Sequence, residues 1–239
     1  EIESMSKPKV WCLVPAAGLG SRLDSRTPKQ YINLLGKALI RHTLDALGVC
    51  RGLSGIVVGL AAGDEQWQHV VTDEDKILGT YLGGESRAET VLKGLYFLEP
   101  NVSDGDWVLI HDAARPCVRV SDIERLISSR GSGSSGAILA VRTVDTLKEE
   151  DRHQNSIKTV PRDHLWQAQT PQIFPYKALR DALRACDLAG LSDDSSAMEI
   201  AGHSPKLIVG CVENLKVTTQ DDLELARIIL EARYGMLQK

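Results

Sequence analysis

The sequence of 239 residues predicts an α/β fold in which helices cover both faces of a mostly parallel sheet. Three observations predict it: short apolar runs recur along the chain, segments with helical spacing of apolar residues separate them, and glycine turns follow several runs. The chain is long enough for one large domain and shows no internal repeat. We therefore expect residues 1–239 to form a single domain.

Composition narrows the class of protein. The net charge of -4 gives no general electrostatic reason to bind nucleic acid or an anionic membrane. The five cysteines are scattered, without a Cys-x-x-Cys pair, which favours a reducing compartment. No apolar stretch is long enough to span a bilayer, and residues 1–9 lack the apolar core of a signal peptide. We expect a soluble cytoplasmic protein.

Strands and helices alternate through the first part of the chain. Short apolar runs predict strands over residues 10–14, 56–62, 77–82, 107–110 and 138–141. Apolar residues at helical spacing predict helices over residues 38–47, 64–71 and 88–98. A further helix is expected to begin at Ser121, because Glu124 three residues later completes a capping box.

A polar excursion interrupts this alternation over residues 142–165. The segment cannot bury enough apolar surface to be a domain, so it is either a floppy loop or a hairpin-like arm that packs on something else. Apolar chain resumes over residues 166–174, followed by helices over residues 176–188, from Asp193 and over residues 221–237, with a strand at 207–209. The expected buried side of the last helix consists of Leu223, Leu225, Ile228, Ile229 and Leu230.

The first glycine turn, Val14-Pro15-Ala16-Ala17-Gly18-Leu19-Gly20-Ser21-Arg22, follows the first strand. Glycine lets backbone N–H groups approach a phosphate chain. A Walker loop would need Lys and then Ser or Thr after its last Gly, and a dinucleotide fingerprint would need a third Gly, so neither fits. The turn alone is equally consistent with a tight connection, but Arg22 and Lys29 nearby favour a polyphosphate site.

Two more motifs stand where predicted strands end. Gly83-Gly84-Glu85-Ser86-Arg87 is a second glycine turn, and His111-Asp112-Ala113-Ala114-Arg115-Pro116 follows the strand over residues 107–110. Open parallel sheets bind ligands at this edge. A purely structural alternative stays open, in which Asp112 caps a turn and Arg115 pairs with it.

The chemistry of these positions suits phosphoryl or nucleotidyl transfer. The histidines are dispersed, so no cluster has zinc-ligand spacing, and no Gly-x-Ser-x-Gly elbow occurs. Phosphoryl transfer instead needs groups that position reactants and neutralise charge. The glycines and cations at predicted strand ends are Gly18, Gly20, Arg22, Lys29, Gly83, Gly84, Arg87, Arg115 and Lys216.

Together with Pro28-Lys29-Gln30-Tyr31, Thr170-Pro171-Gln172 and Asn214-Leu215-Lys216-Val217-Thr218, these three motifs make six in order. In this set the sequence resembles the 2-C-methyl-D-erythritol 4-phosphate cytidylyltransferases of the non-mevalonate isoprenoid pathway. The resemblance implies a Rossmann-like, glycosyltransferase-A-like nucleotidyltransferase fold with a protruding dimerisation arm. It implies transfer of CMP from CTP to 2-C-methyl-D-erythritol 4-phosphate, giving 4-CDP-2-C-methyl-D-erythritol and pyrophosphate.

The same resemblance assigns roles to residues. It places Arg22 and Lys29 along the triphosphate, and Lys216 and Arg162 at the acceptor phosphate, as catalytic groups. The substrate-binding residues that it implies are Ala16, Ala17, Gly18, Gly20, Gly84, Glu85, Thr90, Asp112, Ala113, Arg115, Thr146 and Thr170. Among these, the backbone of Ala16, Ala17 and Gly84 would read cytosine with Glu85 and Thr90, and Asp112 would face ribose, metal or acceptor hydroxyls. Magnesium is expected mainly through the CTP phosphates, with Asp112 a possible ligand.

The resemblance also implies a homodimer in which the arm clasps its twin, so that Thr146 and Arg162 serve the neighbouring site. The sequence departs from the family pattern at Thr90, where Ser is commoner, at Glu85-Ser86, where Asp-Glu is commoner, and at Ser195, where Ala is usual. The hydroxyl and the carboxylate are retained, so only detail of the cytosine pocket is affected.

Two alternatives stay open. A ribitol-5-phosphate cytidylyltransferase would keep the CTP apparatus and change only acceptor contacts, although the Pro-Ala-Ala-Gly start favours methylerythritol phosphate. A regulator that binds CTP without catalysis is the alternative from another class. The cations Arg22, Lys29 and Lys216 count against it.

Overall fold

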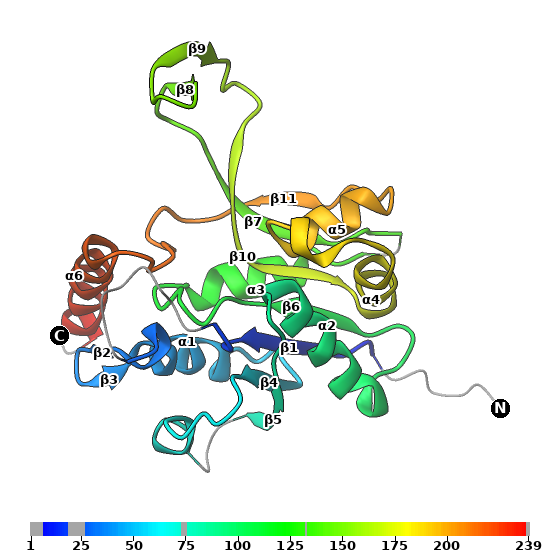
Figure 1. Cartoon of the computed structure of the whole chain (residues 1–239). Helices are drawn as coiled ribbons and strands as arrows, with labels where there is room; N and C mark the ends of the chain where they lie inside the picture. Colours follow the sequence, from blue (N-terminus) through cyan, green and yellow to red (C-terminus); the bar gives the residue numbers. More distant parts are fainter. Residues whose placement is uncertain (1–6, 19–26, 73–75, 132, 238–239) are drawn as a thin grey trace.

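A computed structural model of the protein describes residues 7–18, 27–72, 76–131 and 133–237 (Figure 1). Its centre is a seven-stranded sheet in the order β11-β7-β10-β6-β1-β4-β5. The strands are β1 (Val10–Pro15), β4 (Gly55–Leu60), β5 (Ile77–Leu82), β6 (Trp107–Ile110), β7 (Ala137–Arg142), β10 (Trp166–Pro175) and β11 (Lys206–Val209). Only β10 runs antiparallel to its neighbours in this sheet, so the prediction of a mostly parallel sheet is confirmed.

Helices cover both faces of the sheet, as predicted. They are α1 (Leu39–Gly48), α2 (Arg87–Leu98), α3 (Val120–Ser128), α4 (Tyr176–Ala185), α5 (Asp194–Ile200) and α6 (Gln220–Leu237). The alternation of side chains along β1 divides the core, because successive residues of a strand point to opposite faces. Cys12 packs in the cluster that contains residues of α1 and α3, whereas Leu13 packs in the cluster that contains residues of α2, α4 and α5.

The parallel strands β1, β4, β5 and β6 bring their carboxyl ends to one edge of the sheet. Both glycine turns and the His111-Asp112 motif therefore meet at this edge. Short elements complete this region: the 3₁₀ helix η1 (Lys29–Tyr31) and the strands β2 (Asn33–Leu34) and β3 (Lys37–Ala38), which pair with each other. Helix α6 packs nearby, with Ala226 and Leu230 in a third cluster beside Leu34 and Leu39.

The polar excursion forms a hairpin that projects away from the sheet (Figure 1). Its strands β8 (Leu147–Glu150) and β9 (Ser156–Val160) pair antiparallel in a sheet of their own. Almost every side chain of the two strands is exposed. The hairpin thus has no core, in line with its polar sequence.

Three local predictions were wrong. The expected helix over residues 64–71 is only the 3₁₀ helix η2 (Trp67–His69), because the Asp64 carboxylate accepts the N–H groups of Gln66 and Trp67 in a turn. The expected capping box at Ser121 is absent: α3 begins at Val120, and its N-cap Arg119 makes no capping side-chain bond. Helix α4 ends at Ala185 rather than Leu188, where η4 (Leu188–Gly190) starts after Asp187 and is capped by that residue.

The buried face of α6 was predicted only in part. Leu230 is 4% exposed, but Leu225 and Ile228 are 53% and 50% exposed. The buried stripe instead passes through Leu223, Ala226 and Leu230, which follow helical spacing on one side. None of the helices in the described part of the chain is both long enough and apolar enough to cross a membrane.

This stripe leads to a stability prediction. Leu230→Ala should lower the free energy of unfolding by about 2–5 kcal/mol, because it leaves a cavity beneath α6. The matched change Leu225→Ala should cost less than about 1 kcal/mol, since that side chain is half exposed. Chemical denaturation followed by circular dichroism measures both. Equal losses for the two variants would contradict the described face of α6.

Candidate active site

A cavity of about 800 Å³ lies at the carboxyl ends of β1, β4, β5 and β6. Its wall is built from the two glycine turns, η1, the first turns of α2, the turn after β6 and the loop before α6. Of the residues predicted for the site, those on the cavity wall are Ala16, Ala17, Gly18, Lys29, Gly84, Glu85, Thr90, Asp112, Ala113 and Lys216. Gly20 and Arg22 lie outside the described residues.

Backbone contacts fix the first turn to its neighbours. The N–H of Ala16 donates to the carbonyl of Gly59 at 2.8 Å, which continues the pairing of β1 with β4 beyond the strand. The buried side chain of Gln30 donates through Nε2 to the carbonyl of Ala16, also at 2.8 Å. Since Gln30 follows Lys29 in η1, this bond holds Lys29 on the wall beside the turn.

The second turn is held as firmly. The N–H of Gly84 donates to Oγ1 of Thr90, which in turn donates to the carbonyl of Ser86, at 3.0 and 2.9 Å. Ser86 caps α2 by accepting the N–H of Glu89, and the Glu89 carboxylate accepts the N–H of Glu85. These bonds leave the backbone of the turn in one conformation at the cavity.

The two glycine turns touch each other, which explains one of the glycines. A Cβ atom on Gly83 would collide with the Cβ of Ala17 in the first turn. The N–H of Gly83 donates to the carbonyl of Leu60 at 2.8 Å, so the backbone cannot retreat without losing that bond. Gly83 therefore serves the close approach of the two turns.

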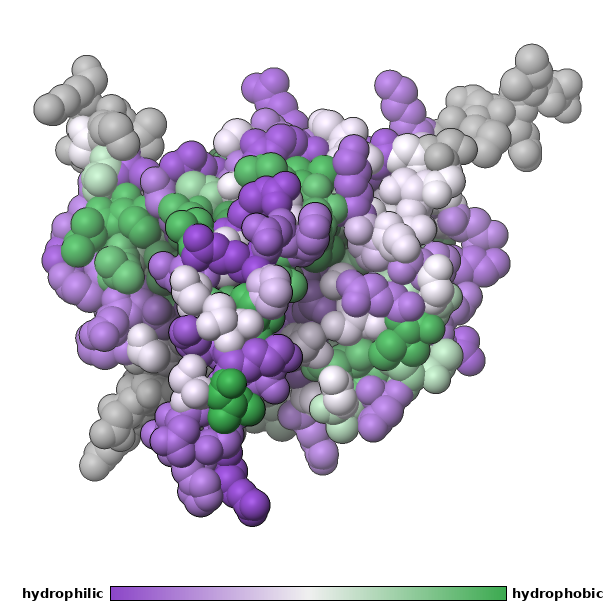
Figure 2. Space-filling model, turned by 90° about the horizontal axis from the view of Figure 1, so that it is seen from above, coloured by the Kyte–Doolittle hydropathy of each residue, from purple (hydrophilic) through white to green (hydrophobic). Residues whose placement is uncertain are grey.

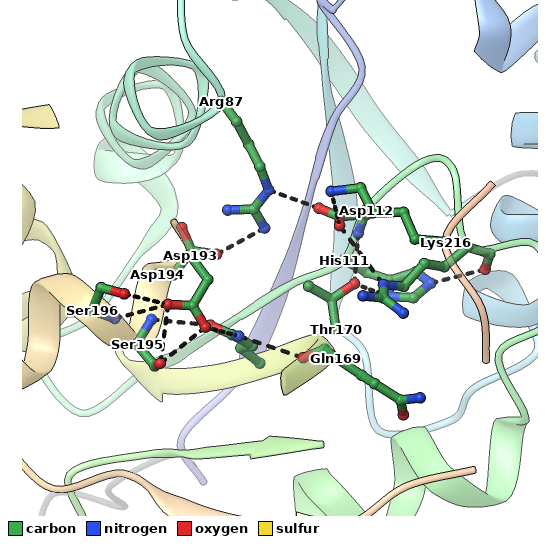
Figure 3. Close-up of polar contacts among 12 residues, drawn as sticks. Arg87, His111, Asp112, Gln169, Thr170, Asp193, Asp194, Ser195, Ser196 and Lys216 are labelled. Atoms are coloured by element: carbon green, nitrogen blue, oxygen red, sulfur yellow. Dashed lines mark hydrogen bonds and ion pairs between the residues drawn. The ribbon is translucent and has the colours of Figure 1, made fainter. Parts of the chain in front are cut away.

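Asp112 is the electrostatic centre of the wall (Figure 3). Its Oδ1 lies 2.7 Å from Nε of Arg87, and its Oδ2 lies 2.9 Å from Nζ of Lys216 and 3.7 Å from Nε of Arg115. Burial alone would raise the pKa of Asp112, but the charges of Arg87, Lys216 and Arg115 outweigh it and hold that pKa well below its usual range. The carboxylate is therefore ionised at neutral pH.

A buried polar layer supports Asp112 from behind. The hydroxyl of Thr170 accepts the N–H of Asp112 and lies 3.0 Å from Nδ1 of His111. Nε2 of His111 lies 3.3 Å from the carbonyl of Arg115, which can only accept. Burial lowers the pKa of His111 to about 4, so the neutral ring carries its proton on Nε2 and accepts the Thr170 hydroxyl proton on Nδ1.

The loop that carries Lys216 is tied to the same layer. Nη1 of Arg115 donates to the carbonyl of Asn214 at 2.6 Å, and Nδ2 of Asn214 donates to the carbonyl of Thr170 at 2.8 Å. Asn214 is fully buried. Arg115 and Thr170 thus contact the cavity residues from behind, and neither is part of the described cavity wall.

The arm residues do not reach the cavity within one chain. Thr146 directly precedes β8 and Arg162 follows β9, both are exposed, and neither is among the described lining residues. Figure 1 shows the arm directed away from the sheet and its flanking helices. A single chain therefore does not bring all of the predicted residues together.

Sequence reasoning missed several residues of this region. Arg87, noted only as one of several cations at strand ends, contacts Asp112 and also lies 2.9 Å from Asp194 at the start of α5. Lys93 lines the cavity, where Nζ donates to the carbonyl of Gly83 and pairs with Glu89. Asp194 was predicted only as a helix start, and no local pattern indicates that it meets Arg87 across the fold.

The protonation of His111 can be tested directly. Its ring should stay neutral from pH 7 down to about pH 4, because burial opposes the charged form. Nitrogen-15 NMR of the imidazole should show the Nε2–H tautomer over that range, with His111→Gln assigning the signal. In the unfolded chain the pKa of this ring is near 6.5, so the unfolded state binds a proton more readily than the folded state. The free energy of unfolding should therefore fall as the pH decreases from about 6.5 toward 4. An imidazolium signal for His111 at pH 6 would contradict the described hydrogen bonds.

Comparisons with known proteins identify the family of the chain. The sequence model of the 2-C-methyl-D-erythritol 4-phosphate cytidylyltransferase family matches residues 10–232. Proteins of that name from Azoarcus sp. (strain BH72) and Dechloromonas aromatica (strain RCB) are 44% and 45% identical, over 97% and 95% of this chain and 98% and 99% of theirs.

Solved structures show the same likeness. A crystal structure of a 4-diphosphocytidyl-2C-methyl-D-erythritol synthase is 35% identical, with a TM-score of 0.83 over 94% of this chain and 100% of that chain. The cytidylyltransferase of Francisella tularensis is 34% identical, with a TM-score of 0.80 over 92% of this chain and 99% of its own. The chain therefore belongs to the 2-C-methyl-D-erythritol 4-phosphate cytidylyltransferase family.

Proposed function

We propose that the protein transfers the cytidylyl group of CTP to 2-C-methyl-D-erythritol 4-phosphate, releasing pyrophosphate, as a step of isoprenoid precursor synthesis. The observation that carries the proposal is that both glycine turns line one cavity together with Lys29 and Lys216. Family membership supplies the identity of the substrates. The family match over residues 10–232 also supports a single cytidylyltransferase domain, with the arm of residues 142–165 within it.

Cytosine recognition fits the rigid backbone of the turns. The turn from Gly83 to Thr90 is fixed by hydrogen bonds, so its peptide groups on the cavity wall offer set donors and acceptors. Cytosine and uracil present opposite donor and acceptor groups at two adjacent ring positions. A fixed site that pairs with one base leaves buried polar groups unpaired with the other, which gives strong discrimination. The backbone of Ala16 and Ala17, with the side chains of Glu85 and Thr90, completes the proposed base site.

Transfer itself needs charge and orientation more than a base. The phosphate monoester of the acceptor is ionised at neutral pH and can attack the α-phosphorus of CTP, with pyrophosphate as the leaving group. The bond from the acceptor oxygen to phosphorus forms while the bond to pyrophosphate breaks, so no proton has to move. We assign neutralisation of the developing charge to Lys29 and to Arg22 of the first glycine turn, and attraction of the acceptor phosphate to Lys216.

Magnesium fits this site as an ion carried by the nucleotide. Among the described residues, no group of three His, Cys, Asp or Glu side chains is placed to hold a metal. Both oxygens of Asp112 already contact cations. Mg²⁺ keeps several waters and binds readily through phosphates, so we propose that CTP holds it mainly, with Asp112 as the protein carboxylate nearby. When bound, the ion would supply charge neutralisation at the phosphates.

We further propose a homodimer in which each arm completes the site of the neighbouring chain. Support comes from the exposure of Thr146 and Arg162 and from a hairpin without a core. Apolar side chains on the arm, Val144 and Ile157, are 75% and 59% exposed. Figure 2 views the molecule from the side on which the arm projects and shows hydrophobic patches among hydrophilic residues. A partner chain that covers these hydrophobic patches would also bring its own Thr146 and Arg162 to the site.

A cytoplasmic location is part of the proposal. All five cysteines are free, and three of them are fully buried, as expected for a reducing compartment. The acidic net charge supports small anionic substrates bound at a local cationic site rather than nucleic acid or membrane as partners.

A pyrophosphate-release assay tests the proposed function. The wild-type protein with CTP and Mg²⁺ should release pyrophosphate with 2-C-methyl-D-erythritol 4-phosphate and at least tenfold more slowly with ribitol 5-phosphate. UTP in place of CTP should reduce kcat/KM by at least about 100-fold, because the base site is rigid. Turnover only with ribitol 5-phosphate would identify the alternative acceptor. CTP binding without any pyrophosphate release would identify a regulator.

Mixed dimers test the role of the arm. Lys29→Ala and Arg162→Ala should each lower kcat by about 100-fold or more, since each removes a charge that matters in the transition state. If the arm serves its neighbour, a dimer of the two variants has one site with both residues intact. Mixing the variants should then restore up to about a quarter to a half of the wild-type activity. No recovery, with mixed dimers verified by mass spectrometry, would show that each arm serves its own chain.

A further inference from the structure

Arg87 stands apart from the other cations of the cavity because it bridges two carboxylates. It is the first residue of α2, and its side chain crosses from this helix to the end of β6, where Nε meets Asp112 at 2.7 Å. Nη2 of the same guanidinium lies 2.9 Å from Asp194 of α5 (Figure 3). The Arg87 side chain is only 26% exposed, and the Asp194 side chain is 1% exposed.

The second carboxylate that Arg87 contacts, Asp194, is not placed to bind a substrate in the cavity. Asp194 is buried behind Arg87 and is not among the described lining residues of the cavity. Its own burial raises its pKa, an effect that Arg87 opposes. A buried carboxylate is costly unless a partner neutralises it, so its contribution here is to hold the guanidinium. The α5 helix is itself anchored by Asp193, which caps it and accepts Nε2 of Gln172 from β10.

The contact of Arg87 with one oxygen of Asp112 also affects the other oxygen of that carboxylate. Arg87 contacts Oδ1, which leaves Oδ2 to face Lys216. A carboxylate held at one oxygen cannot rotate freely, so the direction of the other oxygen is set as well. Lys216 is 38% exposed and carries a long flexible side chain, so its ammonium group needs such a partner to stay on the cavity wall.

We infer that Arg87 is a positioning residue, which Asp194 anchors from behind, and that it fixes the Asp112 carboxylate and through it the ammonium group of Lys216. This inference rests on the proposed function, in which Lys216 attracts the acceptor phosphate. The Asp194–Arg87–Asp112–Lys216 chain links α5, α2, the end of β6 and the loop before α6. It therefore connects Lys216, in the acceptor half of the site, to Asp194, which lies outside the described cavity wall.

The test compares Arg87→Gln with Asp194→Asn in the pyrophosphate-release assay. Arg87→Gln should lower kcat/KM for the acceptor at least tenfold and change CTP affinity by less than about threefold, because the nucleotide turns are held by other bonds. Asp194→Asn should lower the same parameter a few-fold. The double variant should lose less than the product of the two single losses, since both act on one bridge.

The split between the two substrates separates positioning from mere folding. Among the described residues, Asp112 faces Arg87, Lys216 and Arg115, with His111 beside it and Asp194 beyond Arg87. Because Arg87 acts through Asp112 on Lys216, Arg87→Gln should raise the KM for the acceptor and leave the KM for CTP within about threefold. Asp194→Asn should change the acceptor KM in the same direction by a smaller factor.

The matched control is Arg180→Gln. Arg180 also contacts two carboxylates, Glu99 at 2.7 Å and Asp181 at 3.2 Å, but it lies outside the described cavity wall. Its replacement should leave kcat/KM and the KM values for both substrates within about twofold of the wild type. Arg87→Lys, which keeps the charge but contacts fewer oxygens, should recover part of the lost activity.

The outcomes are distinct. If Arg87→Gln loses activity while Asp194→Asn behaves like the wild type, Arg87 binds substrate directly. If both variants behave like the wild type, Arg87 has no role in the reaction. Either result overturns the inference. If Arg87→Gln does not fold, the double variant, which removes both charges, replaces it. If the wild type releases no pyrophosphate, the proposed function fails, and a crystal structure of Arg87→Gln still tests whether Asp112 turns and the Lys216 ammonium group leaves it.

Discussion

The ion pairs of Asp112 are the interactions on which the site depends. Three cations from three parts of the chain converge on one carboxylate at the end of β6. The attraction of these cations outweighs the effect of burial on the pKa of Asp112 and keeps the carboxylate ionised. The arrangement also brings positive charge to the cavity where we propose that anionic substrates bind, and it reduces the repulsion between the cations. Asp112 therefore connects three parts of the chain and lowers the net positive charge at the cavity.

The glycine turns on the other side of the cavity follow a different principle. There the protein uses backbone and close packing: Gly83 allows contact with Ala17, and Gln30 ties η1 to the first turn. Rigid peptide groups suit a base, whose hydrogen-bonding groups have fixed directions, whereas charged side chains suit phosphates, which carry several negatively charged oxygens. The two halves of the cavity thus match the two kinds of chemistry in the proposed substrates.

Much of this was predictable from the sequence, and the limits have physical causes. The buried strands, α1 and α2 followed from continuous or periodic apolar runs, and the motifs at strand ends identified most of the cavity wall. The failure at Asp64 came from a side chain that accepts backbone N–H groups in a turn. At Ser121 the helix begins one residue earlier than the capping pattern predicts, after Arg119. Leu225 and Leu230 are equally apolar, and only the packing of α6 on Leu34 and Leu39 decides which is buried. The contact of Arg87 with Asp194 joins residues far apart in sequence, so no local pattern contains it.

The reversed direction of β10 has a consequence for assembly. Because β10 is antiparallel to both β6 and β7, the end of β7 and the start of β10 lie at the same edge of the sheet as the cavity. The chain can therefore leave that edge, form β8 and β9, and return to it, as the two halves of one long hairpin. A parallel crossover would have returned the chain to the opposite edge. One inverted strand thus allows an insertion of any length to begin and end beside the site without disturbing the sheet that builds it.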